Sequence, residues 1–181
     1  HTDIKGPFEQ KSYDGYKYFQ PYIDCASGRI FVVLLKSRKE AFDKFVKLKR
    51  LLENETDRKL KTLLSDKATE FHTSKKMREF AENEGLKLRF STAHTPQQNG
   101  IAERSIRTLT EMSLTMLKEA KMPAIYWSEA VRTAVYIRNR SMSSAFRLSH
   151  DKTPMEVWTG EIPEMSKMRI FGCIAYAKVN N

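Results

Sequence analysis

The sequence predicts a single α/β domain in which helices cover a mixed β-sheet. With 181 residues, the chain is long enough to bury one sizeable core and too short for two comfortable ones. Its apolar residues form short alternating or β-branched stretches in some places and recur at helical spacing in others. The expected order of elements, βββαβαβαα, is typical of a sandwich of helices on a mixed sheet.

Three strands are expected first. A segment carrying Asp3 opens the chain, and its abrupt start indicates a piece of a longer protein, since such a strand would normally begin several residues earlier. Residues 16–24 are rich in aromatic side chains and residues 29–36 in β-branched ones, with turn residues at 25–28 between them. We expect an antiparallel meander in which Pro21 occupies a position that needs no ladder donor.

Helices alternate with strands after this meander. Ser37 and Glu40 have the spacing of a capping box, which predicts a helix that ends near Asn54. A second helix, at 74–84, has Gly85 as its C-terminal stop. The remaining elements are a strand at 59–65 that leads to Asp66, a strand at 86–90, a helix after residue 99 and a helix that begins at Pro123.

The helix after the fifth strand has two distinct faces. Its apolar stripe comprises Ile106, Leu109, Met112, Met116 and Leu117. Its polar face comprises Glu103, Arg107, Thr110 and Glu111. Glu103 with Arg107 one turn further on suits a site that handles a metal and a phosphate backbone, but the pair also has the spacing of an ordinary solvated ion pair.

The structural signals weaken from Ser141 onward. Breaker residues interrupt the segment 154–163, and we expect the last apolar stretch, residues 169–179, to pack as an isolated strand. The sequence therefore divides into a core domain at 1–140 and a C-terminal extension at 141–181 that is packed or partly ordered.

The composition favours a nucleic-acid partner. Lys and Arg outnumber Asp and Glu by 32 to 22, for a formal charge of +10, and a basic domain favours polyanions. The sequence shows no transmembrane run, signal peptide or amphipathic basic terminus that would indicate a membrane. Two distant cysteines make no disulfide framework, which indicates a reducing, intracellular setting. Neither these cysteines nor the four scattered histidines have zinc-ligand spacing.

Three acids stand at the ends of predicted elements. Asp3 lies on the first strand, Asp66 ends the fourth and Glu103 begins the helix after the fifth, so neighbouring first and fourth strands would bring them together. Carboxylates without histidine or cysteine suit Mg²⁺ or Mn²⁺, and two such ions can promote in-line attack on a phosphodiester. Because the chain has 22 acids, spacing alone does not select this triad, and Asp24 is another candidate for its first member.

Three blocks of the sequence, HTDIKGP, LLSDKATEF and HTPQQNGIAERSIRTLTE, resemble the signature blocks of retroviral-type integrase catalytic cores, and especially those of copia-type retrotransposons. Between Asp66 and Glu103 lie 36 residues, close to the spacing of that family's D,D-35-E pattern. The stretches IDCASGRIFV, YIRNR, TPMEVWTG and RIFGCIAY extend the resemblance to nearly the whole chain.

The resemblance implies a ribonuclease-H-like fold with a mixed five-stranded sheet, and Asp3, Asp66 and Glu103 as the metal-binding catalytic triad. Asp3 is preferred to Asp24 because the segment after Asp24 resembles the family's second strand. The implied enzyme is a polynucleotidyl transferase with DNA endonuclease activity that uses Mg²⁺ or Mn²⁺. It would trim the 3′ ends of retrotransposon DNA and join them to target DNA.

The resemblance also implies contacts and partners. Gln97, Gln98 and Asn99 match a mobile loop that touches DNA, and Arg107 matches a position at which a basic residue meets phosphate, with Arg104 as a further contact. The partners would be double-stranded DNA, from transposon ends and target, and further copies in a homodimer or larger assembly. The place of action would be the nucleus, after an intracellular particle stage. We expect weak, salt-sensitive DNA binding by this chain alone.

One departure from the family pattern opens an alternative. Lys67 and Ala68 stand where the family usually has Asn-Gly, which places an ammonium beside a metal ligand and an alanine where glycine allows unusual backbone angles. The alternative is an integrase-derived DNA- or protein-binding module whose catalysis has decayed. A third interpretation is a ribonuclease-H-type nuclease that cuts the RNA strand of RNA–DNA hybrids. The block TPQQNGIAER, which resembles integrases, argues against it.

Overall fold

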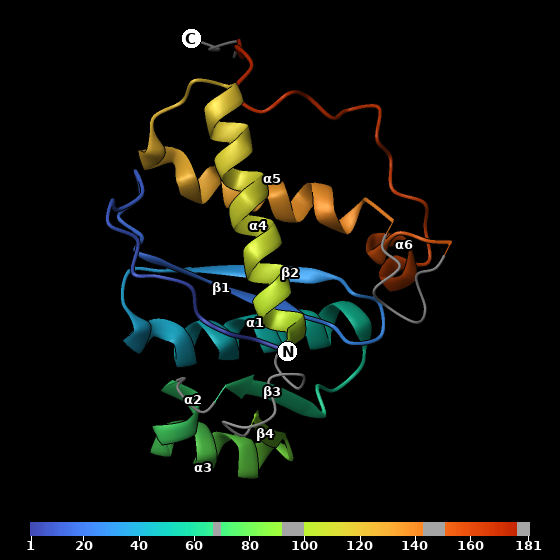
Figure 1. The fold of residues 1–181 in the computed structure, drawn as a ribbon. Helices are drawn as coiled ribbons and strands as arrows, with labels where there is room; N and C mark the ends of the chain where they lie inside the picture. The colour runs from blue at the N-terminus through green and yellow to red at the C-terminus, as the bar shows by residue number, and fades with distance from the viewer. Residues whose placement is uncertain (67–69, 92–99, 143–150, 177–181) are drawn as a thin grey trace, which may run out of the picture.

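The computed structural model describes residues 1–66, 70–91, 100–142 and 151–176. Its elements are β1 (Tyr18–Ile23), β2 (Ile30–Leu35), η1 (Arg38–Glu40), α1 (Ala41–Thr56), β3 (Thr62–Asp66), α2 (Glu70–Thr73), α3 (Lys75–Glu84), β4 (Lys87–Ser91), α4 (Gly100–Glu119), η3 (Ala124–Tyr126), α5 (Trp127–Asn139) and α6 (Pro154–Thr159) (Figure 1). None of the helices in these ranges has the length and apolar character needed to cross a bilayer.

In the described part of the chain, four regular strands form two pairs. β1 and β2 are antiparallel, as predicted, with Tyr18 opposite Leu35. β3 and β4 are parallel, with Asp66 opposite Ser91 at their carboxyl ends. The predicted strands at 59–65 and 86–90 therefore exist, each with its bounds shifted by one to three residues toward the C-terminus.

The segment His1–Lys5 lies between the two pairs. Thr2 forms an antiparallel bridge to Tyr22 of β1 and a parallel bridge to Ser65 of β3. Its N–H also donates to the carbonyl of Leu64 over 2.9 Å. The first segment is thus the neighbour of the fourth predicted strand, as the convergence of the acids requires.

Pro21 explains why this segment is not a regular strand. The backbone exchanges hydrogen bonds of 2.8–3.1 Å within two residue pairs, His1 with Ile23 and Lys5 with Phe19. The same register sets Asp3 opposite Pro21, which has no N–H to donate on this side. Contrary to our expectation, Pro21 stands where the ladder does need a donor. Only isolated bridges result, and a five-stranded sheet is not confirmed.

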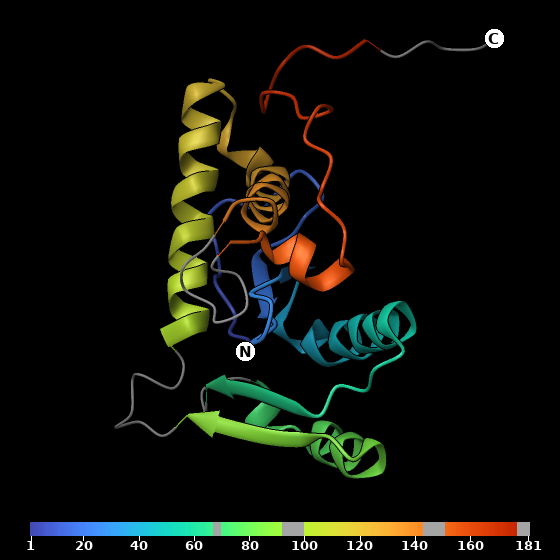
Figure 2. The same ribbon diagram turned by 90° about the vertical axis from the view of Figure 1, so that its right-hand side faces the viewer.

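Two apolar clusters cover the two faces of β1 and β2. Phe19 and Trp127 belong to the cluster shared with α4 and α5, where Phe8 stacks on the Trp127 ring at 4.4 Å. Phe45 and Met77 belong to the cluster shared with α1, α2 and α3. α4 and α1 accordingly stand on opposite sides of β1 and β2 (Figure 2). The apolar stripe predicted for the helix that is now α4 faces the core: Ile106, Leu109 and Leu117 are buried, and Met112 and Met116 pack against the cluster.

Helix ends follow the predicted caps with small differences. The Ser37 hydroxyl oxygen accepts from the N–H of Lys39, and the Glu40 carboxylate accepts from the N–H of Lys36, so the short helix η1 precedes α1. α1 extends to Thr56, two residues past the predicted end. Gly85 ends α3 at φ +65°, as predicted.

The motif YIRNR contains a buried link between α5 and β2. The side-chain oxygen of Asn139 accepts from the N–H of Ile30, and its amide donates to the carbonyl of the same residue, both over 2.8 Å. This asparagine therefore completes the backbone hydrogen bonding at the start of β2.

The C-terminal extension differs from its prediction. Sequence reasoning missed α6, whose Trp158 contacts the Phe31 ring edge-on at 5.3 Å and donates from its indole N–H to Glu55. The strand expected at 169–179 is wrong for residues 169–176, which form no strand and lie along the outside of the molecule (Figure 1). Alternating apolar residues make a strand only beside a partner, and here Ile170 is 84% exposed. Residues 177–179 lie outside the described residues.

Candidate active site

The site lies where the N-terminal segment, the β3–β4 pair and the start of α4 meet. In both ribbon views the N-terminus lies between the start of α4 and this pair of strands (Figures 1 and 2). Asp3 is half-buried there, and its carboxylate accepts from the N–H of Ile4 over 2.7 Å. The bridges of Thr2 on both sides fix the backbone next to this carboxylate.

A side chain of the neighbouring strand β4 positions the carboxylate of Asp66. Asp66 is the last residue of β3 and faces Ser91, the last residue of β4. The buried Ser91 hydroxyl donates to the Asp66 carboxylate over 3.3 Å. Sequence reasoning missed Ser91 because a lone serine at a strand end has no periodic signal. Only the register of the parallel pair identifies it.

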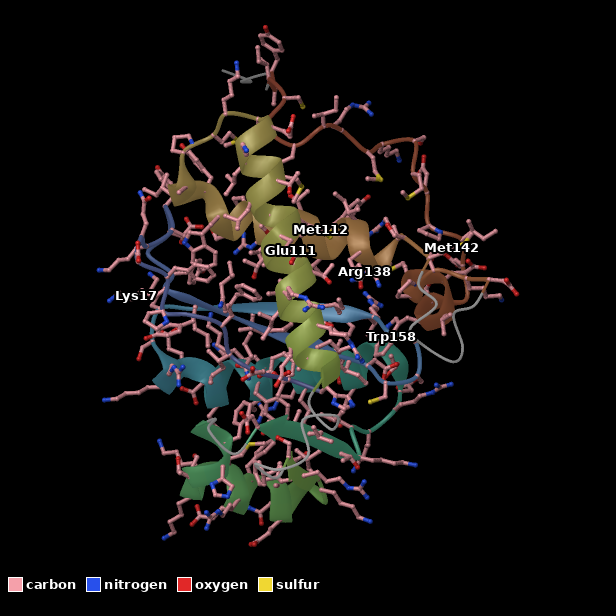
Figure 3. The ribbon with its side chains drawn as sticks, in the orientation of Figure 1. Lys17, Glu111, Met112, Arg138, Met142 and Trp158 are labelled. Atoms are coloured by element: carbon pink, nitrogen blue, oxygen red, sulfur yellow. The ribbon has the colours of Figure 1, made fainter. Side chains whose placement is uncertain are left out.

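Glu103 comes from the first turn of α4 and faces an open groove of about 450 Å³. The groove runs from the N-terminal segment along α4, on whose middle turns Glu111 lies (Figure 3). Its lining residues are Asp3, Ile4, Lys5, Glu103, Ile106, Arg107, Thr110 and Glu111. The predicted polar face of this helix is thus one wall of a groove that also contains Asp3.

Electrostatic interactions tie the three acids together. Burial raises the pKa of the Asp3 carboxyl above its ordinary value, while the hydrogen bond from the Ile4 N–H lowers it. The carboxylates of Asp66 and Glu103 raise the pKa of Asp3 further, and the Arg38 guanidinium lowers it. The net direction is upward, because the burial of Asp3 and the repulsion from its two neighbouring carboxylates outweigh the hydrogen bond and the guanidinium.

The donor set suits a hard divalent cation, since it consists of carboxylate oxygens that repel one another. Their grouping is looser than that of a metal site. Within residues 1–66, 70–91, 100–142 and 151–176, no three Asp, Glu, His or Cys residues are arranged closely enough to hold an ion. A bound ion would have to draw these carboxylates closer together.

The Asp3→Asn variant is expected to be more stable than the wild type at neutral pH. A carboxyl whose pKa is raised by folding binds its proton more tightly in the folded state, so its contribution to stability falls as pH rises through the raised pKa. Asparagine keeps the oxygen that accepts from Ile4 and removes the charge. The thermal midpoint should therefore rise at pH 7, and the gain should shrink toward pH 3.

The exposed acid Asp14 supplies the matched control, since Asp14→Asn removes a charge from a side chain that does not line the groove. If Asp3→Asn lowers the midpoint at pH 7 in the absence of divalent ions, the electrostatic description of this site is wrong.

The remaining predicted residues are distributed as follows. Gln97, Gln98, Asn99, Lys67 and Ala68 lie outside the described residues.

Arg107 lines the groove, whereas the guanidinium of Arg104 turns back toward Gly100 at the start of α4. The Asp24 carboxylate accepts from the N–H groups of Ala26 and Ser27 and from the Ser27 hydroxyl. These bonds build the turn between β1 and β2, which is a structural role for Asp24.

Three relatives of this chain are transposon proteins of plants. A retrovirus-related Pol polyprotein from transposon TNT 1-94 of Nicotiana tabacum is 41% identical over 179 residues, covering 99% of this chain and 13% of the relative. Those from transposons RE2 and RE1 of Arabidopsis thaliana are 33% and 32% identical over 165 residues, 91% of this chain and 11% of each relative. The chain therefore spans only about an eighth of their length. No protein-family model matches the chain.

Solved structures share the fold. The HTLV-2 integrase catalytic core domain in complex with magnesium, in a trimeric form, matches with a TM-score of 0.60 at 17% identity, over 86% of this chain and 92% of that one. A chain of the simian T-cell lymphotropic virus intasome in complex with PP2A regulatory subunit B56 gamma matches with a TM-score of 0.65 at 16% identity, over 96% and 63%. Their fold is the ribonuclease-H-like fold.

Proposed function

Because this chain belongs to the copia-type Pol polyprotein family of transposons and has the fold of retroviral integrase catalytic cores, we propose that it is the integrase catalytic core of such a polyprotein. The proposed reactions are 3′-end processing of retrotransposon DNA and its strand transfer into target DNA. The supporting observation is geometric: the bridge from Thr2 to Ser65 sets Asp3 beside the end of β3 that carries Asp66, and Asp3 lines one groove with Glu103 of α4.

In this proposal Asp3, Asp66 and Glu103 would hold Mg²⁺ or Mn²⁺. When bound, such ions polarise phosphoryl oxygens and lower the pKa of an attacking water or hydroxyl. The chain's own contribution is positioning. The Ile4 N–H orients the carboxylate of Asp3, and the Ser91 hydroxyl orients that of Asp66.

The proposed reaction exchanges one phosphorus–oxygen bond for another. In end processing, water attacks the phosphodiester and a 3′ hydroxyl leaves. In strand transfer, that 3′ hydroxyl attacks a target phosphodiester and another 3′ hydroxyl leaves. No covalent protein intermediate is needed, so in-line positioning supplies much of the rate.

The proposed substrate is double-stranded DNA, from transposon ends and target. The charge of +10 supports a polyanionic partner. We assign DNA contacts to Gln97, Gln98, Asn99, Arg104 and Arg107. We also propose a homo-oligomeric assembly that acts in the nucleus after an intracellular particle stage, with residues 1–140 as the catalytic core and 141–181 as its extension.

A second candidate function is DNA or protein binding by an integrase-derived module without catalysis. Two observations favour it. Lys67 and Ala68 depart from the family pattern, and the carboxylates of the described residues are not grouped as a metal site.

Reactions on labelled duplexes that carry the transposon's end sequence separate these functions. With Mn²⁺, the wild-type chain is expected to join ends to a second duplex, or to resolve a branched duplex that mimics the joined product, since one site catalyses both directions. Both reactions should vanish in Asp66→Asn. If the wild type binds DNA at low salt but neither joins nor resolves it, the binding module is the correct function.

A further inference from the structure

Two cationic side chains line the same groove as Asp3 and Glu103. Lys5 enters it from the N-terminal segment, and Arg107 enters it from α4. In the part of the chain that the structure describes, neither side chain forms an ion pair or a hydrogen bond, although Glu103 and Glu111 also line the groove. The groove therefore presents two unneutralised positive charges beside its acids.

The backbone fixes the position of Lys5. Its N–H donates to the carbonyl of Phe19 over 2.9 Å, and the N–H of Phe19 donates back over 3.1 Å. Residues two apart in an extended segment share a face, so Lys5 lies on the same face as Asp3, roughly 6–7 Å further along. This is the face on which Phe19 packs toward α4.

Arg107 lies at a similar distance from Glu103, the acid on its own wall of the groove. It lies one helical turn beyond Glu103, about 6 Å along the axis of α4. Each wall of the groove thus carries an acid, and about 6 Å further on, a free cation. Thr110 lies in the same groove, but its hydroxyl already donates to the carbonyl of Ile106 over 2.7 Å, so Lys5 and Arg107 are the lining side chains that still have hydrogen-bond donors to offer.

We propose that Lys5 and Arg107 form a phosphate subsite that holds the phosphodiester neighbouring the one that reacts. This inference rests on the proposed function, because it takes the acids as the reactive end of the groove. A planar guanidinium can bind two phosphate oxygens, and an ammonium adds a compact charge from the other wall. Lys5 is in this account a DNA-positioning residue, contributed by the segment that also carries Asp3.

Salt titrations of DNA binding test the subsite without any reaction. The binding constant of a short duplex is measured by fluorescence anisotropy in EDTA from low to moderate salt. Each lost phosphate contact should reduce the slope of log K against log salt by about 0.9. Lys5→Gln and Arg107→Gln are therefore each expected to flatten the slope by about one, and Lys5→Arg should restore it.

Lys47 supplies the control, because it is exposed on α1, on the opposite side of the sheet from the groove. Lys47→Gln should keep the wild-type slope, and circular dichroism should show unchanged folding of all variants. If Lys5→Gln behaves like Lys47→Gln, the subsite assignment is overturned and the proposed function stands.

Two other outcomes separate the inference from the proposed function. A wild-type chain that binds no DNA at low salt overturns both. A flattened slope in Lys5→Gln together with no Mn²⁺-dependent joining by the wild type supports DNA binding in the groove. In that case the subsite remains as a DNA-binding site, its link to a reacting phosphodiester is overturned, and catalysis is rejected.

Discussion

Glu103→Gln is expected to reduce strand transfer and end processing by more than about a thousandfold, because residues that act as one catalytic unit lose most of the rate when any one is removed. The amide has nearly the same shape as the carboxylate and lacks the anionic charge that a hard cation requires. Glu103 is exposed in the first turn of α4, so the substitution should leave folding and DNA binding close to wild type.

Glu111→Gln is the matched control for this variant. Glu111 lies on the same helix and lines the same groove, two turns beyond Glu103. Removing its charge tests whether any lost carboxylate in the groove lowers activity. The rates of joining should fall in Glu103→Gln and stay within about tenfold of wild type in Glu111→Gln. Equal losses of joining activity in the two variants would contradict a specific catalytic role for Glu103.

Phe19→Ala is expected to destabilise the fold by about 3–5 kcal/mol, the usual cost of deleting a buried aromatic side chain. Phe19 is completely buried, with its ring 5.9 Å from that of Phe8 and 6.5 Å from that of Trp127. It joins β1 to α5 and anchors the backbone of Lys5, so its loss should also loosen the segment that carries Asp3.

Urea denaturation followed by circular dichroism measures this loss as a fall in the free energy of unfolding. Tyr13→Ala is the control, because Tyr13 also stacks on a neighbouring ring, that of Tyr126, but is 73% exposed. Its cost should stay below about 1 kcal/mol. If Phe19→Ala costs no more than Tyr13→Ala, the aromatic cluster does not support β1 as described.

Local patterns predicted most of the elements. The stop at Gly85, the alternation in β4 and the apolar stripe of α4 are local signals, and the structure follows them. α6 also had a local signal, because Thr153 caps it and Pro154 occupies its first turn, where proline is favoured. Sequence reasoning took that proline only as a break. α2, with four residues, is too short for any periodicity.

The site depends on relations between distant segments. Periodicity does not show which strand lies beside Asp3, so the adjacency of the first and fourth strands was only a condition for the three acids to meet. The bridge between Thr2 and Ser65 fulfils this condition. Pro21 affects the first segment because proline lacks a donor on the edge of β1 that pairs with this segment. Only the register shows which edge that is. Ser91 and Lys5 join the site for the same reason, since their places follow from strand pairing.

A crystal of this chain soaked in Mn²⁺ tests the central claim, that side chains from three distant segments form one cation site. Anomalous density is expected between the carboxylates of Asp3, Asp66 and Glu103, which should draw together around the bound ion. A soaked crystal with manganese bound elsewhere, and none between these three carboxylates, would contradict the account.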